Sequence, residues 1–335
     1  MILLHTKEIV NFVQNATKET ASNQTKYKKQ INMDNNFKIN KAYYGDCLEV
    51  MKDIPDETVD LCIIDPPYFK VKKHYWDRQW DNSDGFLLFM SLVFNEIYRI
   101  LKKSGSIYVF CYPKLAFEVE GELRKKFNIL NHIVWEKFND KGFDGWKQKT
   151  SKESLRKYYP NSERIIFGEK QSFGKVLKEA RIKYGYTTIS LAEEIGAFGK
   201  TNHGGSVSNW ENDLNVPTED QYTKLQTLLN LPNRSNFIRA FNCKSGVQYT
   251  DVLHYKTVRP YKGKHPCEKP RELIKHLVEM SSNENDTVID CFSGSGVLAE
   301  VCIESNRNWV IIEKDEDYYN LSLKRIDDFL QNKNN

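Results

Sequence analysis

The sequence lacks the features that would place it in several large classes of protein. Its seven cysteines include no C-x-x-C pair and no His/Cys cluster at metal-ligand spacing, so we expect reduced thiols and no metal site. No apolar run approaches the length of a membrane span, and the run at residues 1–4 is too short for a signal peptide, which predicts a cytoplasmic protein without membrane contact. A formal net charge of +4 is too small to indicate a nucleic-acid binder by itself, so any basic surface must be local.

Most of the 335-residue sequence alternates short, β-branched apolar runs with amphipathic helical patterns. Such alternation is typical of a parallel sheet covered by helices, and a chain of this length can bury a sizeable core. We therefore predict an α/β fold with a mostly parallel central sheet. The predicted strands are 41–44, 60–64, 106–112, 129–135, 164–167, 287–290 and 309–313. The predicted helices are 47–52, 85–103, 115–127, 271–280 and 318–330.

Two parts of the chain depart from this alternation. Residues 1–36 are rich in Asn, Lys, Thr and Gln, and we expect a polar, mobile N-terminal extension there. Residues 172–232 show four short helical patterns with a turn-rich connection between the second and third. We therefore predict a main domain over 37–170 and 248–330, and a small all-α domain inserted at 171–247. An insert that merely packs on the main domain is the alternative.

The stretch Asp65-Pro66-Pro67-Tyr68 closes the apolar strand 60–64. Two consecutive prolines cannot continue a ladder, and ligands of open α/β sheets bind just beyond the carboxyl ends of strands. A carboxylate and a free carbonyl can accept hydrogen bonds from an amino group, and an aromatic ring can stack on a flat heterocycle. The combination suits chemistry on the exocyclic amine of a nucleobase, whereas a simple strand stop is the alternative.

Two stretches interleave cations with aromatic residues, a composition that holds and stacks nucleic acid. The first, residues 69–83, contains four neighbouring basic or titratable side chains. The second, residues 137–183, holds 13 Lys/Arg against 6 Asp/Glu. A loop folded back on the core and a solvated basic face are the respective alternatives. The four side chains of the first stretch are Lys70, Lys72, Lys73 and His74.

A second chemical signature lies near the C-terminus. Strand 287–290 ends in Asp290, a glycine loop at 291–296 opens the next helix, and strand 309–313 ends in Glu313. Glycines let the backbone approach a ligand closely, and a carboxylate at the end of the next strand can accept both hydroxyls of a ribose. An acid at the tip of the first strand disfavours a pyrophosphate ligand. The pattern therefore indicates a half-site for a cationic nucleoside cofactor.

Together, three motifs resemble the S-adenosylmethionine-dependent DNA amino-methyltransferases. They are Asp65-Pro66-Pro67-Tyr68, His265-Pro266-x-x-Lys269-Pro270 and Asp290-Cys291-Phe292-Ser293-Gly294-Ser295-Gly296. Their order, with the catalytic motif first, resembles the β group of that family, as does the earlier segment Tyr44-Gly45-Asp46-Cys47. Two positions depart, since Cys291 stands where proline is usual and Val297 where threonine is common. The resemblance implies a Rossmann-like methyltransferase fold over the main domain.

The resemblance also implies roles for individual residues. Asp65 and the Pro66 carbonyl would bind the target amine, and Pro67 and Tyr68 complete the catalytic set, with the ring of Tyr68 stacked on a flipped-out base. No metal is expected, because the sulfonium methyl is already activated and the enzyme mainly supplies alignment. S-adenosylmethionine would be held by Asp46, Cys47, Asp65, His265, Lys269, Asp290, Phe292, Ser293, Gly294, Ser295, Gly296 and Glu313.

The helical insert falls where the β group carries its target-recognition region. Its pattern Leu191-Ala192, Gly196 and Val207-Ser208-x-Trp210-Glu211 resembles the helix-turn-helix of the phage Cro/repressor family, although the link from Gly196 to Val207 is longer here. We therefore expect the insert to read DNA. The predicted DNA contacts are Lys70, Lys72, Lys73, His74, Ser206, Ser208 and Asn209.

The function implied is transfer of a methyl group from S-adenosylmethionine to the N6 amine of adenine in double-stranded DNA. In the family, an Asp at the start of the tetrapeptide is commoner in adenine-N6 than in cytosine-N4 enzymes. A cytosine-N4 enzyme, a catalytically silent DNA-binding regulator and an RNA base methyltransferase are the alternatives. A cognate restriction endonuclease is a further partner that the family suggests, and monomer and homodimer both stay open.

Overall fold

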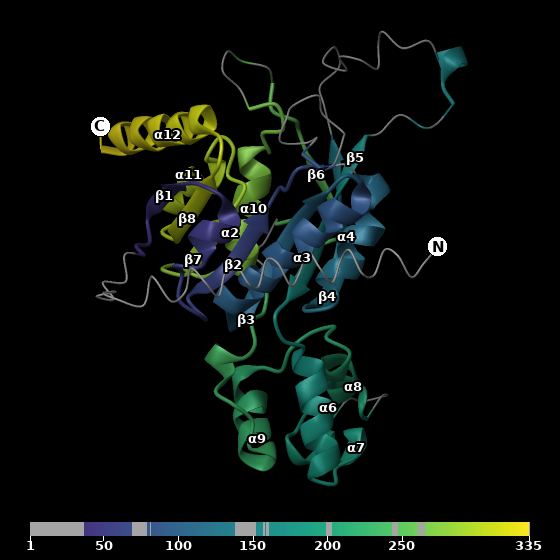
Figure 1. Cartoon of the computed structure of the whole chain (residues 1–335). Helices are drawn as coiled ribbons and strands as arrows, with labels where there is room; N and C mark the ends of the chain where they lie inside the picture. Colours follow the sequence, from purple (N-terminus) through teal and green to yellow (C-terminus); the bar gives the residue numbers. More distant parts are fainter. Residues whose placement is uncertain are drawn as a thin grey trace, which may run out of the picture. The chain divides into compact units, whose positions relative to one another are not determined.

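The computed structural model describes residues 37–68, 79–80, 82–137, 152–156, 158, 161–198, 203–242, 247–259, 261 and 265–334. Residues 37–335 form one compact unit, whose described part is built on an eight-stranded sheet (Figure 1). The extension expected at residues 1–36 lies outside the described residues. The strands are β1 (Lys41–Tyr44), β2 (Val59–Ile64), β3 (Leu101–Cys111), β4 (Asn128–Lys137), β5 (Ser162–Glu169), β6 (Val252–Tyr255), β7 (Thr287–Asp290) and β8 (Asn308–Glu313).

The strands follow one another across the sheet in the order β1-β8-β7-β2-β3-β5-β4-β6. All neighbours run parallel except at β5, which is antiparallel to both β3 and β4. The mostly parallel sheet predicted from the sequence is therefore confirmed. The chain runs outward from β2 to β3 on one side and from β7 to β8 on the other. Ligands of open α/β sheets bind at such a reversal of strand order, beyond the carboxyl ends of the strands.

Helices cover both faces of the sheet, because successive side chains of a strand point to opposite sides. On β2, Cys62 and Ile64 join a core with α2, α3 and α4, whereas Leu61 and Ile63 join a second core with α10, α11 and α12. Burial on both faces explains the unbroken apolar run of this strand. The helices are α2 (Cys47–Met51), α3 (Ser83–Ile100), α4 (Ala116–Leu123), α10 (Arg271–Ser281), α11 (Val297–Glu304) and α12 (Glu316–Asn334).

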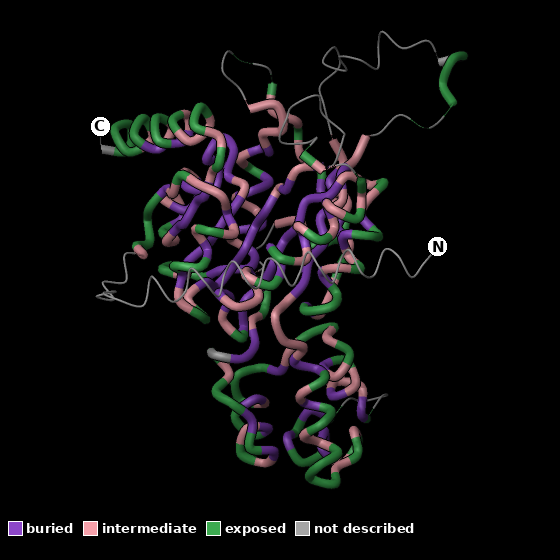
Figure 2. Tube along the Cα trace, in the orientation of Figure 1, coloured by how far each residue is buried: buried purple, intermediate pink, exposed green. Residues whose placement is uncertain are grey.

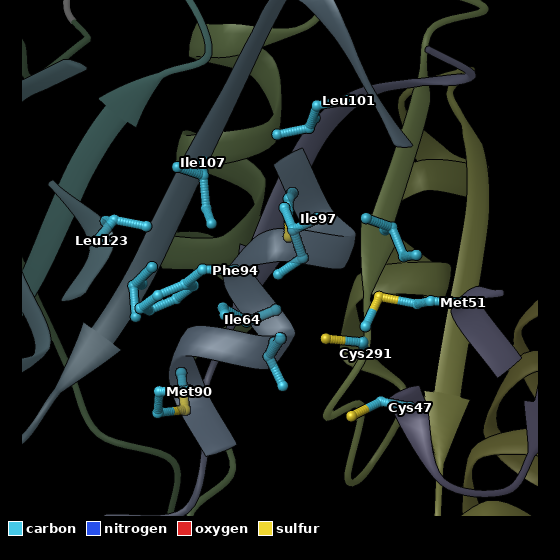
Figure 3. Close-up of a cluster of buried hydrophobic side chains, with 14 of the residues drawn as sticks. Cys47, Met51, Ile64, Met90, Phe94, Ile97, Leu101, Ile107, Leu123 and Cys291 are labelled. Atoms are coloured by element: carbon cyan, nitrogen blue, oxygen red, sulfur yellow. The ribbon is translucent and has the colours of Figure 1, made fainter. Parts of the chain in front are cut away.

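The first core fixes α3 against the centre of the sheet. Figure 3 shows Met90, Phe94 and Ile97 of α3 gathered with Ile64 and Ile107 in this core.

Figure 2 shows that the buried segments follow the central strands, while exposed positions follow the outer helices. No helix within the described ranges is both long and apolar enough to cross a membrane. Short 3-10 turns occur at η2 (Pro113–Leu115), η3 (Lys152–Ser154) and η4 (Arg234–Asn236).

Two features of the sheet differ from the prediction. The helix predicted for 85–103 ends at Ile100, and β3 begins at once with Leu101, whose extended backbone is in register with Val59 of β2. The apolar helical spacing continues through Leu101, so the pattern alone does not reveal the change. Strand β6 is missing from the prediction, because it is four residues long, lies at the edge of the sheet and buries only Leu253.

The inserted region forms helices around a third core. They are α6 (Phe173–Lys183), α7 (Thr188–Glu194), α8 (Gly205–Glu211) and α9 (Glu219–Leu229). Val207 and Trp210 of α8 are buried in this core, and Glu211 is paired with Arg181 of α6. The pattern Val-Ser-x-Trp-Glu thus has a structural purpose within the insert. The helix-turn-helix character of the insert and its status as a separate domain stay predictions.

The insert joins the sheet at the amino-terminal edge of the parallel strands. Antiparallel β5 runs to this edge and leads directly into α6. Asn128, the first residue of β4, donates a hydrogen bond to Asp213 of the insert at 2.9 Å. Arg239, which lies after the last helix of the inserted region, pairs with Asp60 near the start of β2 at 3.1 Å. The carboxyl ends of β2 and β7 lie at the opposite edge of the sheet.

Candidate active site

The carboxyl ends of β2, β7 and β8 open into a pocket beside the reversal of strand order. Its empty space is about 960 Å³, part of it open to solvent. A smaller pocket adjoins it, shares Asp65 and Gly294 with it, and extends to Lys269 and Asp290. The larger pocket is lined by Gly45, Asp46, Cys47, Asp65, Pro66, Pro67, Tyr68, Gln79, Phe89, His265, Cys267, Cys291, Phe292, Gly294, Ile312, Glu313, Lys314, Asp315 and Tyr318.

The glycine loop is tied to the end of β8 through the carboxylate of Glu313. One carboxylate oxygen accepts the N–H of Gly294 at 2.7 Å, and the other accepts the N–H groups of Lys314 and Asp315, each at 2.9 Å. Gly294 and Gly296 adopt positive φ angles of 49° and 72°. The left-handed backbone that the loop requires is available to glycine without steric cost.

Gly296 is the position of this loop where a side chain is least tolerable. A Cβ there would lie 2.6 Å from the Cβ of Ser322, in addition to the strain of a left-handed backbone. We predict that Gly296→Ala lowers the free energy of unfolding by about 2–4 kcal/mol, measured by denaturant titration. Gly121→Ala is the matched control, because Gly121 lies within α4 and a new Cβ there would have no atom within 4 Å apart from the backbone of its own helix and its chain neighbours. It should stabilise the protein by about 0.5–1 kcal/mol, and equal effects of both changes would contradict the packing argument.

Together with Glu313, two further acids make the pocket region suited to a cationic, hydroxyl-bearing ligand. Asp290 is buried and accepts the N–H of Phe292 at 2.9 Å, and burial raises the pKa of its carboxyl to about 8. Asp46 caps α2 by accepting the N–H of Leu48 at 3.0 Å. A bound cation would relieve the desolvation of Asp290, since an opposite charge favours the ionised carboxylate.

Asp65 lines both pockets and has one carboxylate oxygen without a hydrogen-bond partner among the described residues. Its Oδ2 accepts a hydrogen bond from the Nζ of Lys269 at 2.6 Å, whereas its Oδ1 is buried and has no partner among the described residues. Burial raises the pKa of Asp65, although the ammonium of Lys269 opposes the shift. A buried acceptor without a partner costs free energy unless a ligand completes it. The Oδ1 atom is therefore an acceptor that an N–H group of a ligand could complete.

Tyr68 and Lys269 are held by a further acid, Glu163 at the start of β5. The hydroxyl of Tyr68 donates to Glu163 at 3.0 Å and accepts from Lys269 at 3.1 Å. Lys269 also lies 3.3 Å from the carboxylate of Glu163 and 5.1 Å from the ring centroid of Tyr68. Although burial opposes it, the pKa of Glu163 is lowered to about 2 by the ammonium groups of Lys269 and Lys137. The carboxylates of Asp65 and Glu163 in turn raise the pKa of Lys269, although burial opposes this shift.

The structure brings most of the predicted site residues together at this edge of the sheet. Lys269, expected to help hold the cofactor, pairs through its ammonium with Asp65 and Glu163, and its contact with the cofactor stays a prediction. Gly296 lines neither pocket and serves as the cap of α11. The predicted residues that line one or both pockets are Asp46, Cys47, Asp65, Pro66, Pro67, Tyr68, His265, Lys269, Asp290, Phe292, Ser293, Gly294, Ser295 and Glu313.

The predicted DNA contacts do not gather at this site. Lys70, Lys72, Lys73 and His74 lie outside the described residues. Ser206, Ser208 and Asn209 lie on α8, within the insert at the opposite edge of the sheet, where Asn209 is exposed and the two serines are half-buried.

Sequence reasoning missed several residues of the site. Three of them follow β8: Lys314, Asp315 and Tyr318. Their place after a strand that ends in an acid was the signal that could have indicated them. Glu163 gave no such signal, because an acid at the start of a strand normally lies at the edge remote from the ligand. Here β5 is antiparallel, and its first residues therefore lie beside the carboxyl end of β3.

Comparisons with known proteins agree with this geometry. Among curated proteins, the chain is similar to the type II methyltransferase M1.MboII of Moraxella bovis, with 27% identity over 85% of this chain and 95% of the relative. It is similar also to the DNA adenine methyltransferase YhdJ of Escherichia coli K12, with 28% identity over 85% of this chain and 81% of the relative.

Two solved structures share the fold. The complex of M1.HpyAVI with S-adenosylmethionine superposes with a TM-score of 0.52 at 18% identity, covering 85% of this chain and 98% of that chain. The cytosine-N4-specific PvuII DNA methyltransferase gives a TM-score of 0.50 at 16% identity, covering 87% and 91%. The Rossmann-like methyltransferase fold predicted from the sequence is thereby confirmed. Residues 59–324 match the profile of the N6/N4 DNA methylase family, and this chain therefore belongs to that family.

Proposed function

We propose that this protein transfers a methyl group from S-adenosylmethionine to the N6 amine of adenine in a base flipped out of double-stranded DNA. The observation that carries the proposal is the free, buried Oδ1 of Asp65, held beside Tyr68 by the contact of Oδ2 with Lys269. Relatives named as DNA adenine methyltransferases support adenine as the target. The absence of a spanning helix in the described part and the DNA substrate are consistent with a cytoplasmic location.

The residues of the pocket fit the cofactor. When bound, S-adenosylmethionine supplies an activated methyl group on a positively charged sulfonium. Glu313 would accept the ribose hydroxyls, Asp290 and Asp46 would face the positive charge and polar groups, and Gly294 would let the backbone approach. Ser293 supplies a further buried hydroxyl, which has no partner among the described residues. The acids of the pocket match the positive charge and the hydroxyl groups of S-adenosylmethionine, and the unpaired hydroxyl of Ser293 is available to it as well. This match supports the assignment.

The catalytic residues act by alignment. Asp65 Oδ1 and the carbonyl of Pro66 would accept the two N–H groups of the exocyclic amine, which leaves the nitrogen lone pair directed away from both acceptors. The ring of Tyr68 would stack on the base. The carboxylate of Asp65 would also be able to accept the amine proton that must leave after transfer. Fixing the amine in this geometry removes orientational freedom, which is a large source of rate acceleration.

The proposal is tested by identifying the methylated nucleoside. The purified protein is incubated with isotopically labelled S-adenosylmethionine and unmethylated duplex DNA, and the DNA is digested and analysed by mass spectrometry. N6-methyladenine is the expected product. N4-methylcytosine would move the assignment to the alternative that the PvuII relative represents. A parallel reaction contains RNA in place of DNA. Label in the RNA, with none in the DNA, would support an RNA methyltransferase. Absence of product in both reactions would favour the alternative of a catalytically silent DNA-binding regulator.

We propose further that the helical insert contributes to target recognition. Residues 172–238 hold seven Lys/Arg and seven Asp/Glu, so the insert lacks the basic excess that drives non-specific DNA binding. Any contact it makes would therefore depend on polar side chains such as Ser206 and Asn209. Because the insert joins the sheet at the edge opposite Asp65, it would contact base pairs away from the flipped base. A cognate endonuclease and the oligomeric state stay predictions.

Replacing residues 172–238 by a Gly/Ser linker tests this role. Arg239 is retained, because it pairs with Asp60 and Asp286 of the main domain. The insert has its own core, so we predict that the truncated protein folds and still binds S-adenosylmethionine. Preference for the cognate site over a scrambled duplex should fall to the non-specific level in competition binding at matched salt. Retained preference in a folded, truncated protein would assign recognition to residues outside the insert.

A further inference from the structure

We infer that Glu163 is a positioning residue of the methyl-transfer reaction, which holds Tyr68 and Lys269 so that Asp65 offers a single free oxygen to the target amine. This inference rests on the proposed function. It concerns an acid that none of the sequence motifs contains and that the antiparallel course of β5 brings to the pocket edge.

The contacts of Glu163 connect it to both catalytic side chains. Its Oε2 accepts the hydroxyl proton of Tyr68 at 3.0 Å, which fixes the position of the aromatic ring from its outer end. The same oxygen lies 3.3 Å from the Nζ of Lys269. Lys137, at the end of β4, pairs with the other oxygen, Oε1. Both oxygens of the carboxylate are therefore occupied by protein groups, and Glu163 itself does not contact the pocket.

Lys269 carries the influence of Glu163 to Asp65. Its ammonium is almost fully buried and lies between two carboxylates, at 2.6 Å from Asp65 and 3.3 Å from Glu163. It also donates to the hydroxyl of Tyr68 at 3.1 Å and faces the carbonyl of Cys267 at 3.4 Å. With its donors directed in this way, Lys269 can occupy only one oxygen of Asp65. The other oxygen remains for the substrate.

The charge of Glu163 also sets the protonation states of the pair. Its carboxylate raises the pKa of Lys269 and, by repulsion, the pKa of Asp65. Methyl transfer in the proposed geometry needs Lys269 protonated and Asp65 ionised. Removing the negative charge of Glu163 therefore lowers both pKa values and moves the acid limb of the pH–rate profile, which reports Asp65, to lower pH. The titratable groups that face this cluster are Asp65 and Tyr68 after β2, Cys111 on β3, Lys137 on β4, Cys267 and Lys269 before α10, and Asp290 at the end of β7.

Glu163→Gln tests the inference, because the amide keeps the shape and one acceptor but loses the charge. We expect kcat to fall by about 10- to 100-fold, the dissociation constant of S-adenosylmethionine to stay unchanged, and the acid limb of the pH profile to shift downward. Glu169→Gln is the matched control. Glu169 ends the same strand at the opposite edge of the sheet and bonds to Asn128, so its loss should leave kcat and the pH profile unchanged.

A second variant keeps the test decisive if Glu163→Gln fails to fold. Glu163→Asp retains the charge and retracts the carboxylate by one methylene, so kcat should fall while the pH limbs stay in place. Unchanged kcat and pH profile in a folded Glu163 variant, with an active wild type, would overturn the inference. Absence of methyl transfer in the wild type would instead refute the proposed function, so the two failures are distinguishable.

Discussion

Asp65→Ala should reduce methyl transfer by about 10³-fold or more while S-adenosylmethionine still binds, because the change removes an acceptor aligned on the amine and leaves the proposed contacts to the ribose intact. The free Oδ1 of Asp65 is the atom whose loss matters most, since the protein offers it no other partner among the described residues. Calorimetric titration of the cofactor, beside a turnover assay with labelled methyl groups, measures the two quantities separately.

Two controls accompany this variant. Asp65→Asn keeps an acceptor oxygen and the side-chain size but loses the charge, so its activity should lie between wild type and Asp65→Ala. A thermal melt shows whether the fold survives; we expect that it does, because the buried ammonium of Lys269 keeps Glu163 as its partner at 3.3 Å. Turnover near the wild-type rate in Asp65→Ala would remove Asp65 from the catalytic set.

Glu313→Ala should weaken the binding of S-adenosylmethionine by about 3–6 kcal/mol, because two charge-assisted hydrogen bonds of about 1.5–3 kcal/mol each would be lost. That loss corresponds to roughly 10²- to 10⁴-fold in the dissociation constant. The three backbone N–H groups that Glu313 now accepts would also lose their partner, including that of Gly294 in the glycine loop. The loop would therefore become less ordered around the cofactor.

Glu316→Ala is the matched control for this experiment. Glu316 is an exposed acid three residues further along, in the first turn of α12, and does not line the pocket. Its removal should leave the affinity for S-adenosylmethionine unchanged. Equal dissociation constants for Glu313→Ala and wild type, measured by calorimetry, would show that the glycine loop serves a different ligand.

The sequence was sufficient to predict the central strands and the loops that follow them. Strand β2 is buried along its whole length, so its apolar run is unbroken and stops visibly at Pro66. Gly294 and Gly296 need left-handed backbone, and this requirement leaves glycine in the sequence as a signal. Local causes of this kind act on neighbouring residues and can be read from a single stretch of chain.

Long-range causes could not be read in this way. Glu163 joins the site only because β5 runs antiparallel between β3 and β4, and strand direction is not encoded in the apolar pattern of the strand itself. Likewise Lys269 was recognised from its motif, but its pairing with Asp65 depends on a contact between residues 204 positions apart. The edge at which the insert joins the sheet follows from the same reversal of β5.

The attachment of the insert has a consequence for the shape of any DNA that both ends of the protein contact at once. Strand β5 spans eight residues, or about 26 Å, between the edge that carries the pocket and the edge that carries the insert. A straight duplex that crosses one edge, perpendicular to the strands, does not reach the other. In that orientation simultaneous contact requires curvature, which costs about 1–6 kcal/mol for 40–90° over 20–30 base pairs. Flexible pyrimidine–purine steps between the two contacts would lower this cost, so base pairs that the protein never touches would influence where it methylates.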